Sequence, residues 1–308
     1  MTGSLPAIVR FGGYQPPASV HSRAALDFGA ALHRTLGYSV RFEFQGDVTA
    51  DGRNAADLLQ MVETGKLDLC YFASSYLAGR VPEFELLDLP FTVDSREQAY
   101  RRLDGELGER LARRLRDATA YRLLGYWDNG FRHFSNAVRP IRAPADCRGL
   151  RIRTLFSDLH RQTFATLGFD PVALDVRDLR RAVEDGTVSA QENPLTTFDL
   201  FGLQRYHPYV TLSAHFFGVV LLLCNAAAYD AWPGEIQQAV DAAAAEATAS
   251  QRRYAAAEDE RVLAVLRRAG TDVTTLSSEE RAAFVAAVEP ILAQQRKKHG
   301  TDLSAPLS

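Results

Sequence analysis

At the start of the chain, apolar and polar residues follow strand and helix periods in turn. Around Val40, alternate residues are apolar, which is typical of a half-buried strand. Between Ser19 and Gly37, apolar residues recur at helical spacing, and the glycine marks the end of the helix. The predicted order is a strand at 8–11, a helix at 19–37, a strand at 40–44, a helix at 54–64 and a strand at 67–71. This β-α-β-α-β order predicts a mostly parallel α/β sheet.

The same order of elements returns in the second half of the chain. Its predicted elements are a strand at 151–153, helices at 157–167 and 178–185, and a strand from 186. The segment Val183–Ser189 resembles Val62–Asp68, because each places a glycine between a helix and a strand. We interpret this as two lobes of similar construction, although such junctions are common in α/β proteins and one repeat alone is weak support.

Two further helices are predicted near the end of the chain. Residues 239–268 are rich in Ala and lack Gly and Pro, which predicts one long helix. Ser277 and Glu280 form a capping box that opens a last helix to about Lys298. No low-complexity tract or Ser/Gly linker separates the lobes, so we expect the chain to cross between them more than once.

Length and charge narrow the function. The 308 residues are enough for two domains with sizeable cores. The formal net charge is -3 and no basic stripe is present, which argues against nucleic acid as the main partner. The basic run at 296–299 is most simply a helix-end cluster. Cys70, Cys147 and Cys224 are too scattered for a zinc site or a disulfide framework, and we interpret them as buried hydrophobes.

The sequence alone does not decide the cellular location of the chain. The longest apolar run, at 216–224, is too short to span a bilayer, which needs about twenty residues. The N-terminus has no basic region followed by an apolar core, so no signal peptide is visible. Two interpretations follow. Either the chain is cytoplasmic, or the sequence begins after a removed leader, with Met1–Ser4 as an added remnant.

Enzyme signatures are absent from the sequence. We find no nucleophile elbow, zinc-protease motif, phosphate-binding loop or dinucleotide fingerprint, so no catalytic residue and no cofactor are predicted. The seven histidines are dispersed. His215, at the end of a predicted strand over 209–214, is either a ligand contact or, more commonly for such a residue, a hydrogen-bonded core histidine.

The most informative chemistry lies in the strand at 151–153. Side chains alternate along a strand, so Arg151 and Arg153 share one face. A guanidinium fixed on a strand suits bidentate capture of a carboxylate, because its donors form a planar fork. The alternative, which is more common for such residues, is an edge strand with solvated arginines.

Three more segments are predicted as site loops at strand ends. Residues 127–132 bring an aromatic side chain and Arg132 to a strand exit, where α/β sheets bind ligands. Residues 191–194 offer amides and Glu192, and Ser74 and Ser75 close a strand at 67–72. We expect the arginine strand and the segments 127–132 and 191–194 to end strands in one direction and to form an anion site together. Glu192 or an exchangeable anion then compensates a buried arginine.

The order of several short motifs resembles the DctP-type substrate-binding proteins of TRAP transporters. Single motifs are weak, but their order and spacing from about Phe11 through the long helix are specific. The motifs are Leu67-Asp68-Leu69, Val81-Pro82-Glu83, Asp88-Leu89-Pro90-Phe91, Gly130-Phe131-Arg132, Gly149-Leu150-Arg151-Ile152-Arg153, Gly168 with Pro171-Val172, and Gln191-Glu192-Asn193-Pro194.

The resemblance implies an α/β, two-lobed, periplasmic-binding-protein-like fold with a hinge and a long helix spanning both lobes. Residues 1–127 and 218–256 are expected to form lobe I, and residues 128–217 and 257–308 lobe II. It also implies a periplasmic receptor, its leader removed or replaced in this sequence. The receptor is expected to capture a small organic acid and deliver it transiently to a TRAP membrane permease. We expect a monomer with no metal or cofactor.

The resemblance also assigns roles to residues. Arg153 is implied to bind the substrate carboxylate, Arg132 to be a second cation in the cleft, and Asn193 to supply an amide. Glu192 and Arg151 are expected to contact these ligand-binding residues without contacting the ligand. The other implied ligand contacts are Tyr14, Asp51, Ser74, Ser75, Trp127, His215 and Phe216.

The nature of the acid stays open at this point. Aromatic residues near predicted strand ends favour an apolar or cyclic body, whereas a short dicarboxylate would occupy both Arg132 and Arg153. The alternatives to transport are a ligand sensor of the same fold that serves a signalling partner and a cytoplasmic enzyme on this scaffold.

Overall fold

The chain forms two compact units in a computed structural model that describes residues 6–300. The chain passes from one unit to the other five times, after Ser74, Gly108, Asp128, Gly218 and Ala256. The segment 75–108 belongs to unit 2, whereas the sequence analysis placed it in lobe I. Unit 1 comprises Met1–Ser74, Glu109–Asp128 and Val219–Ala256, and unit 2 comprises Ser75–Gly108, Asn129–Gly218 and Ala257–Ser308. The predicted remnant Met1–Ser4 lies outside the described residues.

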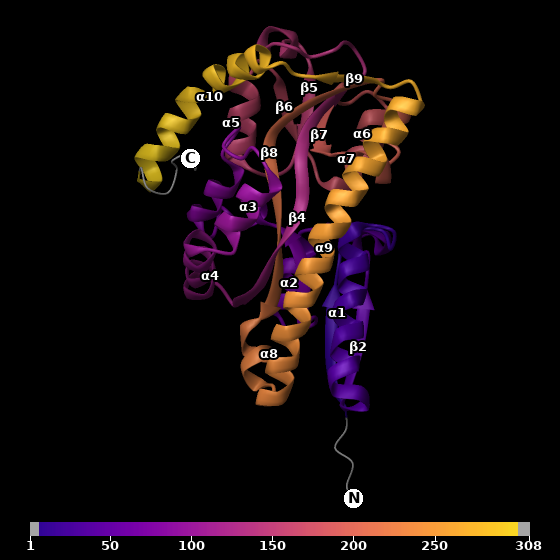
Figure 1. Cartoon of the computed structure of the whole chain (residues 1–308), viewed down its shortest axis with the longest axis vertical. Helices are drawn as coiled ribbons and strands as arrows, with labels where there is room; N and C mark the ends of the chain where they lie inside the picture. The colour runs from indigo at the N-terminus through magenta and orange to yellow at the C-terminus, as the bar shows by residue number, and fades with distance from the viewer. Residues whose placement is uncertain (1–5, 301–308) are drawn as a thin grey trace, which may run out of the picture. The chain divides into compact units, whose positions relative to one another are not determined.

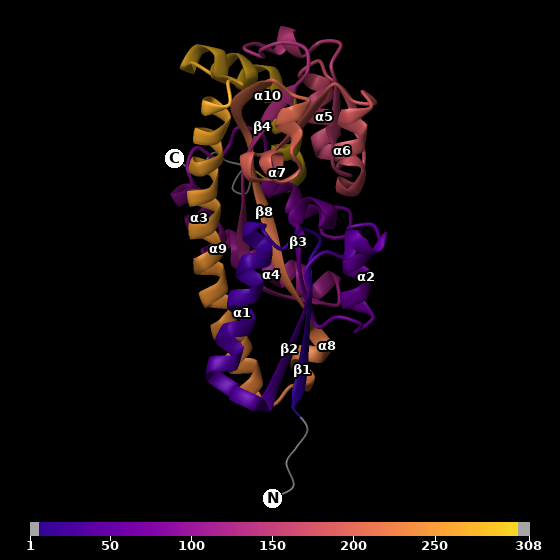
Figure 2. The same cartoon turned by 90° about the vertical axis from the view of Figure 1, so that its right-hand side faces the viewer.

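Unit 1 begins with the predicted β-α-β-α-β order. Strand β1 pairs in parallel with β2 and with β3, and β3 pairs antiparallel with the second half of β8. Helix α1 starts after the Ser19 cap and packs along β2 (Figure 2). The elements with residues in this unit are β1 (Ala7–Gly12), α1 (Val20–Leu36), β2 (Val40–Gln45), α2 (Asp57–Glu63), β3 (Leu69–Ala73), α4 (Glu106–Ala118), β4 (Tyr121–Asn136), β8 (Tyr209–Asn225), α8 (Ala226–Ala231) and α9 (Gly234–Arg268).

Unit 2 is built around strands β5, β6 and β7, which are parallel, with β4 antiparallel to β7. Helix α9 supplies residues to both units, and it is the long orange helix in Figure 1. The further elements of unit 2 are α3 (Arg96–Leu103), β5 (Arg151–Thr154), α5 (Asp158–Thr166), β6 (Asp170–Ala173), α6 (Val176–Glu184), β7 (Ala190–Pro194), α7 (Leu195–Leu200), β9 (Asp272–Thr275) and α10 (Ser278–His299).

The repeated helix-glycine-strand junction has the same backbone conformation in both units. Gly65 follows α2 with φ of 71°, and Gly186 follows α6 with φ of 73°. Both values lie in the left-handed region, where glycine is favoured because it has no Cβ. The sequence repeat therefore reflects one shared way of ending a helix before a buried strand.

Two strands are longer than predicted from the sequence, and a third lies further along the chain than predicted. Strand β4 continues past Tyr126 to Asn136, so Trp127 and Arg132 lie inside a strand and not in a loop after it. Strand β7 covers Ala190–Pro194, whereas the sequence predicted a strand from 186 with residues 191–194 as the loop after it. Strand β8 continues through Phe216 to Asn225. Polar residues and glycine are ordinarily loop signals, but here the polar side chains are buried and hydrogen-bonded, so the pattern was misleading.

The expectation that the candidate segments end strands in one direction is wrong for β4. Strands β5 and β7 are parallel, but Arg132 on β4 pairs with Pro194 in an antiparallel ladder. Gly130 allows this arrangement, because its φ of 98° is unfavourable for other residues and a Cβ would lie 3.0 Å from Pro194 Cβ. Arg132 is therefore placed by strand pairing.

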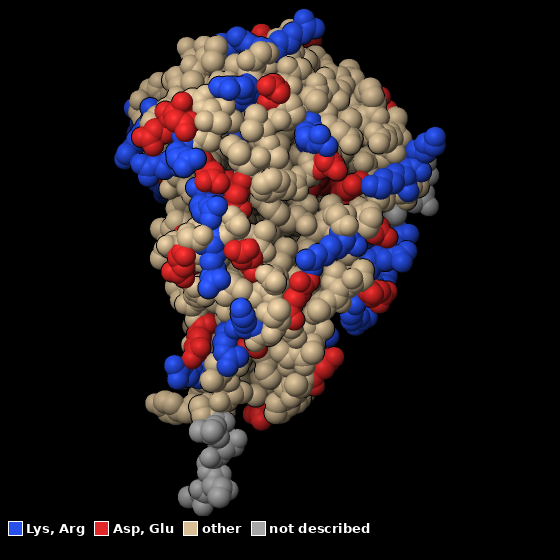
Figure 3. Space-filling model, turned by 180° about the vertical axis from the view of Figure 1, so that it is seen from behind, with Lys and Arg blue, Asp and Glu red and all other residues tan. Residues whose placement is uncertain are grey.

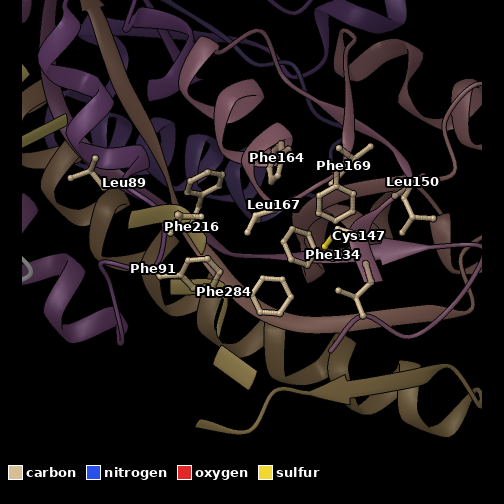
Figure 4. Packing of buried hydrophobic residues seen from close by; sticks show 14 of the residues in the cluster. Leu89, Phe91, Phe134, Cys147, Leu150, Phe164, Leu167, Phe169, Phe216 and Phe284 are labelled. Carbon is tan, nitrogen blue, oxygen red and sulfur yellow. The ribbon is translucent and has the colours of Figure 1, made fainter. Parts of the chain in front are cut away.

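The core of unit 2 is rich in phenylalanine. Phe134, Phe164 and Phe216 come from β4, α5 and β8 and pack in one cluster, which Figure 4 shows from close by. Phe164 and Phe216 meet edge-on, with ring centroids 5.8 Å apart. The side chain of Phe216, implied as a ligand contact, is only 1% exposed and is part of this core.

The surface charges and the cysteines agree with two predictions from the sequence, namely that there is no basic stripe and that the cysteines are buried. Acidic and basic side chains are interspersed over the face in Figure 3. Cys70, Cys147 and Cys224 are all buried and carry free thiols. Among residues 6–300, no helix is long and apolar enough to cross a membrane.

Candidate functional site

Arg153 is a fully buried cation on β5. Its side chain is 2% exposed, and its Nε and Nη2 atoms both donate to the backbone oxygen of Leu174, at 3.0 and 2.6 Å. None of the residues described by the structure places a carboxylate oxygen within 4.0 Å of this guanidinium. Burial lowers the pKa of Arg153 from its ordinary value. The bonds to Leu174 occupy one edge of the guanidinium fork, which leaves the edge formed by Nη1 and Nη2.

Arg151 has a different environment on the same strand. It is exposed, and its Nη2 donates to the backbone oxygen of Gly186. The backbone N–H of Arg151 donates to Ser189 Oγ, which fixes the start of β5. Arg153 is thus the buried member of the pair and Arg151 the solvent-exposed one.

Arg132 forms a buried ion pair with Glu192. Phe134 on β4 lies opposite Glu192 on β7, so Arg132, two residues earlier on the same face, is the diagonal neighbour of Glu192. Arg132 Nε donates to Glu192 Oε2 at 2.5 Å, and Nη2 donates to Oε1 at 2.8 Å. Both side chains are almost completely buried. The charge of Arg132 is therefore already compensated within unit 2.

A chain of side-chain hydrogen bonds extends from this ion pair. Arg132 Nη2 donates to Asn193 Oδ1 at 3.1 Å, and Asn193 Nδ2 donates to Gln191 Oε1 at 2.7 Å. Gln191 Nε2 in turn donates to Ser135 Oγ at 2.6 Å, and Ser135 Oγ lies 2.9 Å from His207 Nδ1. Each amide is held from both sides, so the orientation of Asn193 is fixed before any ligand arrives.

Two histidines flank the Glu192 carboxylate. His215 Nε2 lies 3.4 Å from Oε2, and its ring stacks on Phe134 with centroids 4.2 Å apart. His160 Nδ1 lies 4.0 Å from Oε1, and its Nε2 lies 3.3 Å from Asp88 Oδ1. His215 is thus both a buried, hydrogen-bonded core residue and a neighbour of the ion pair.

Burial and charge act in opposite directions on these groups. Burial raises the pKa of Glu192, but Arg132 and the hydrogen bond from His215 outweigh it and hold the pKa well below its usual range. Burial lowers the pKa of His215 to about 4, although Glu192 opposes this shift. At neutral pH the result is an ionised Glu192 beside a neutral His215.

Tyr76 is a neighbour of Arg153 that sequence analysis missed. It lies in the short 3-10 helix Ser74–Leu77, and burial raises the pKa of its phenol. The positive charge of Arg153 opposes that shift in pKa, and the negative charge of Asp175 adds to it. The sequence pattern pointed to Ser74 and Ser75 in this turn but not to the tyrosine that follows them, because only the fold brings Tyr76 to Arg153.

Unit 1 holds the predicted contacts Tyr14, Asp51 and Trp127. Trp127 is buried, its Nε1 donates to Thr248 Oγ1 at 3.1 Å, and its ring lies 5.7 Å from that of Tyr71. Tyr14 packs against Tyr71 and Phe72. Asp51 is exposed and accepts a hydrogen bond from Gln45.

The two predicted serines fall on different units. Ser74 ends the first segment of unit 1, and its buried Oγ has no hydrogen-bond partner among the described residues. Ser75 begins the next segment and belongs to unit 2, one residue before Tyr76. The structure thus brings Arg132, Glu192, Asn193 and His215 together in unit 2, with Arg153 electrostatically coupled to Arg132 and Glu192.

The fold defines a class of protein, the two-lobed periplasmic binding proteins, because solved structures of that class superpose on it closely. A solved structure of a sugar acid binding protein from Advenella mimigardefordensis, in complex with galactonate, superposes with a TM-score of 0.92. The two sequences are 26% identical, and the match covers 98% of this chain and 96% of the other. A TRAP periplasmic solute-binding protein from Sulfurospirillum deleyianum with bound succinate has a TM-score of 0.91, 26% identity and 98% coverage of both chains.

Sequence comparison identifies the family. The chain belongs to the bacterial extracellular solute-binding proteins of family 7, the DctP family, whose model matches residues 11–298. The 2,3-diketo-L-gulonate-binding periplasmic protein YiaO of Escherichia coli is 29% identical over 89% of this chain and 83% of its own length. A solute-binding protein of Verminephrobacter eiseniae is 30% identical over 91% of this chain and 82% of its own length. The members are TRAP solute-binding proteins that bind small organic acids, and they are not enzymes.

Proposed function

We propose that this protein captures a small organic acid through one carboxylate held by Arg153, for delivery to a TRAP permease. The supporting observation is that Arg153 is 2% exposed and lies within 4.0 Å of no carboxylate among residues 6–300. A buried cation without a counter-charge is costly, and an anionic ligand relieves that cost on binding. Arg132 is less suited to this role, because Glu192 already neutralises it.

The remaining edge of the Arg153 guanidinium fits a carboxylate. With Nε and Nη2 directed at Leu174 O, the Nη1 and Nη2 atoms together present the geometry of a bidentate pair. The fixed amide of Asn193 is proposed to donate to the same ligand, and Arg132 to add positive potential without forming the main salt bridge. Tyr14, Asp51, Ser74, Ser75, Trp127, His215 and Phe216 remain proposed contacts or wall residues.

The proposal also covers the oligomeric state, the docking on the permease and the leader. We take unit 1 and unit 2 as the two lobes of a monomer that docks transiently on the permease. We also propose that the natural precursor carries a leader, since relatives such as YiaO are named as periplasmic proteins.

The experiment compares Arg153→Ala with Arg151→Ala by isothermal titration with galactonate and succinate as probes. Arg153→Ala is expected to weaken binding of the better probe by at least about 30-fold, because the ligand loses a buried charged partner. Arg151→Ala is the matched control on the same strand and should leave affinity almost unchanged, because its charge is exposed. Circular dichroism establishes that both variants are folded. Equal affinities for wild type and Arg153→Ala would refute the assignment.

A further inference from the structure

The charges around Arg153 restrict the kind of acid that unit 2 accepts. Arg132 and Glu192 neutralise each other in a buried pair, whereas Arg153, which is electrostatically coupled to both, has no carboxylate within 4.0 Å among the described residues. Unit 2 therefore has one charge to offer to a ligand at this place. A monocarboxylate matches it, whereas the second carboxylate of a dicarboxylic acid finds no buried partner there.

Asp175 places a carboxylate near this cation, although more than 4.0 Å from its guanidinium. It follows Leu174, whose backbone oxygen receives two hydrogen bonds from Arg153. Its carboxylate is close enough to Arg153 and Tyr76 to influence the pKa of both groups. A second anionic group on the ligand would be repelled by Asp175, while a hydroxyl group would find a hydrogen-bond acceptor.

Only one of the two Asp175 oxygens is used by the fold. Oδ1 accepts from the backbone N–H of Arg177 at 2.9 Å and caps the start of α6. Among residues 6–300, Oδ2 accepts no hydrogen bond. The residue is 8% exposed, and Oδ2 is not one of the completely buried polar atoms without a partner. The cap fixes the carboxylate in place, and a fixed acceptor discriminates between ligands better than a mobile one.

We propose that Asp175 is a specificity-determining residue that accepts a hydrogen bond from a hydroxyl group on the carbon next to the ligand carboxylate. The ligand class is then a hydroxylated monocarboxylic acid, with its carboxylate on Arg153. This inference rests on the proposed function and goes beyond it, because the related structures hold galactonate in one case and succinate in the other.

The wild-type test uses four acids of six carbons in isothermal titrations. They are gluconate, 2-hydroxyhexanoate, hexanoate and adipate, which separate the effects of hydroxyl groups from the effect of a second carboxylate. A single hydrogen bond to a charged acceptor is expected to favour 2-hydroxyhexanoate over hexanoate by about 10- to 100-fold. Adipate is expected to bind more weakly than gluconate. A preference for adipate, or equal affinities for hexanoate and 2-hydroxyhexanoate, overturns the inference.

Two variants test whether Asp175 carries the preference. Asp175→Ser and Asp175→Asn both keep a side chain that caps a helix, so α6 is expected to form in each. Both should reduce the preference for 2-hydroxyhexanoate over hexanoate to about threefold or less, as expected when a charged acceptor is lost. Asp178→Asn removes the same charge from the exposed first turn of α6 and is the matched control, which should leave the preference unchanged.

The outcomes separate this inference from the proposed function. An unchanged preference in both Asp175 variants overturns the inference while Arg153 keeps its role. Failure of all four acids, galactonate and succinate to bind the wild type overturns the proposed function and the inference with it. A loss of preference in Asp178→Asn equal to that in the Asp175 variants shows a general charge effect and also overturns the inference.

Discussion

The Glu192→Gln substitution tests the central ion pair of unit 2. Glu192 accepts Arg132 Nε at 2.5 Å and Nη2 at 2.8 Å, and neither side chain has more than a few per cent of its surface exposed. Glutamine removes the negative charge and turns an N–H group toward the guanidinium. Breaking a buried pair in this way costs about 3–5 kcal/mol, because the other charge is left uncompensated. We expect a loss of this size in the free energy of unfolding.

Urea unfolding at pH 7, followed by circular dichroism, measures this loss. The double variant Arg132→Met with Glu192→Leu is the informative control, because it removes both charges and keeps apolar volume. Replacing a buried pair as a whole is often neutral or stabilising, so the double variant should be more stable than Glu192→Gln. A loss below about 1 kcal/mol for Glu192→Gln would refute the reasoning, since it would show that water screens the pair.

Three further predictions concern acid, backbone strain and ligand. Lowering the pH from 7 to 5 should reduce the free energy of unfolding by about 2 kcal/mol through His215 alone. Its pKa is lowered by burial to about 4, so the unfolded chain, with a pKa near 6.5, binds the proton first and stability is lost below about pH 6.5; urea midpoints independent of pH would contradict this. Gly130→Ala should lower the free energy of unfolding in urea more than Gly149→Ala. Both glycines have positive φ, but only a Cβ at Gly130 would lie 3.0 Å from Pro194 Cβ. Equal losses in the two variants would contradict this clash. A ligand at a hundredfold excess over its dissociation constant should stabilise the chain by about 2.7 kcal/mol in the same assay, and no shift with a probe that binds by titration would contradict binding to the folded state.

The sequence predicts the element order well where period and caps agree. Helix α1 begins after the Ser19 cap and α10 after the Ser277 capping box, as expected. Strand β5 at Arg151–Thr154 also lies where the arginines indicated. These features depend on local backbone chemistry, which a single sequence records directly.

The strand ends and the partners of the arginines depend on tertiary packing. Asn129 and Gly130 are ordinary turn signals, yet β4 continues through them, because pairing with β7 and burial outweigh local preference. The sequence suggested that Glu192 orients an arginine but could not say which one. The register of β4 on β7 assigns it to Arg132 and leaves Arg153 to Leu174 and Tyr76. Such pairings need the three-dimensional register, which no local pattern contains.

The repeated passage of the chain between the units constrains the order of folding during synthesis. Unit 1 needs Val219–Ala256 to complete its sheet and helices, and unit 2 needs the segment from Ala257 onward. Neither unit is therefore one continuous piece that could finish folding while the rest of the chain is still being made. Contacts between distant segments slow folding, because long loops must close first. A nascent chain of this topology stays incompletely folded until its last helices emerge, which gives the cell time to move it or to engage a chaperone.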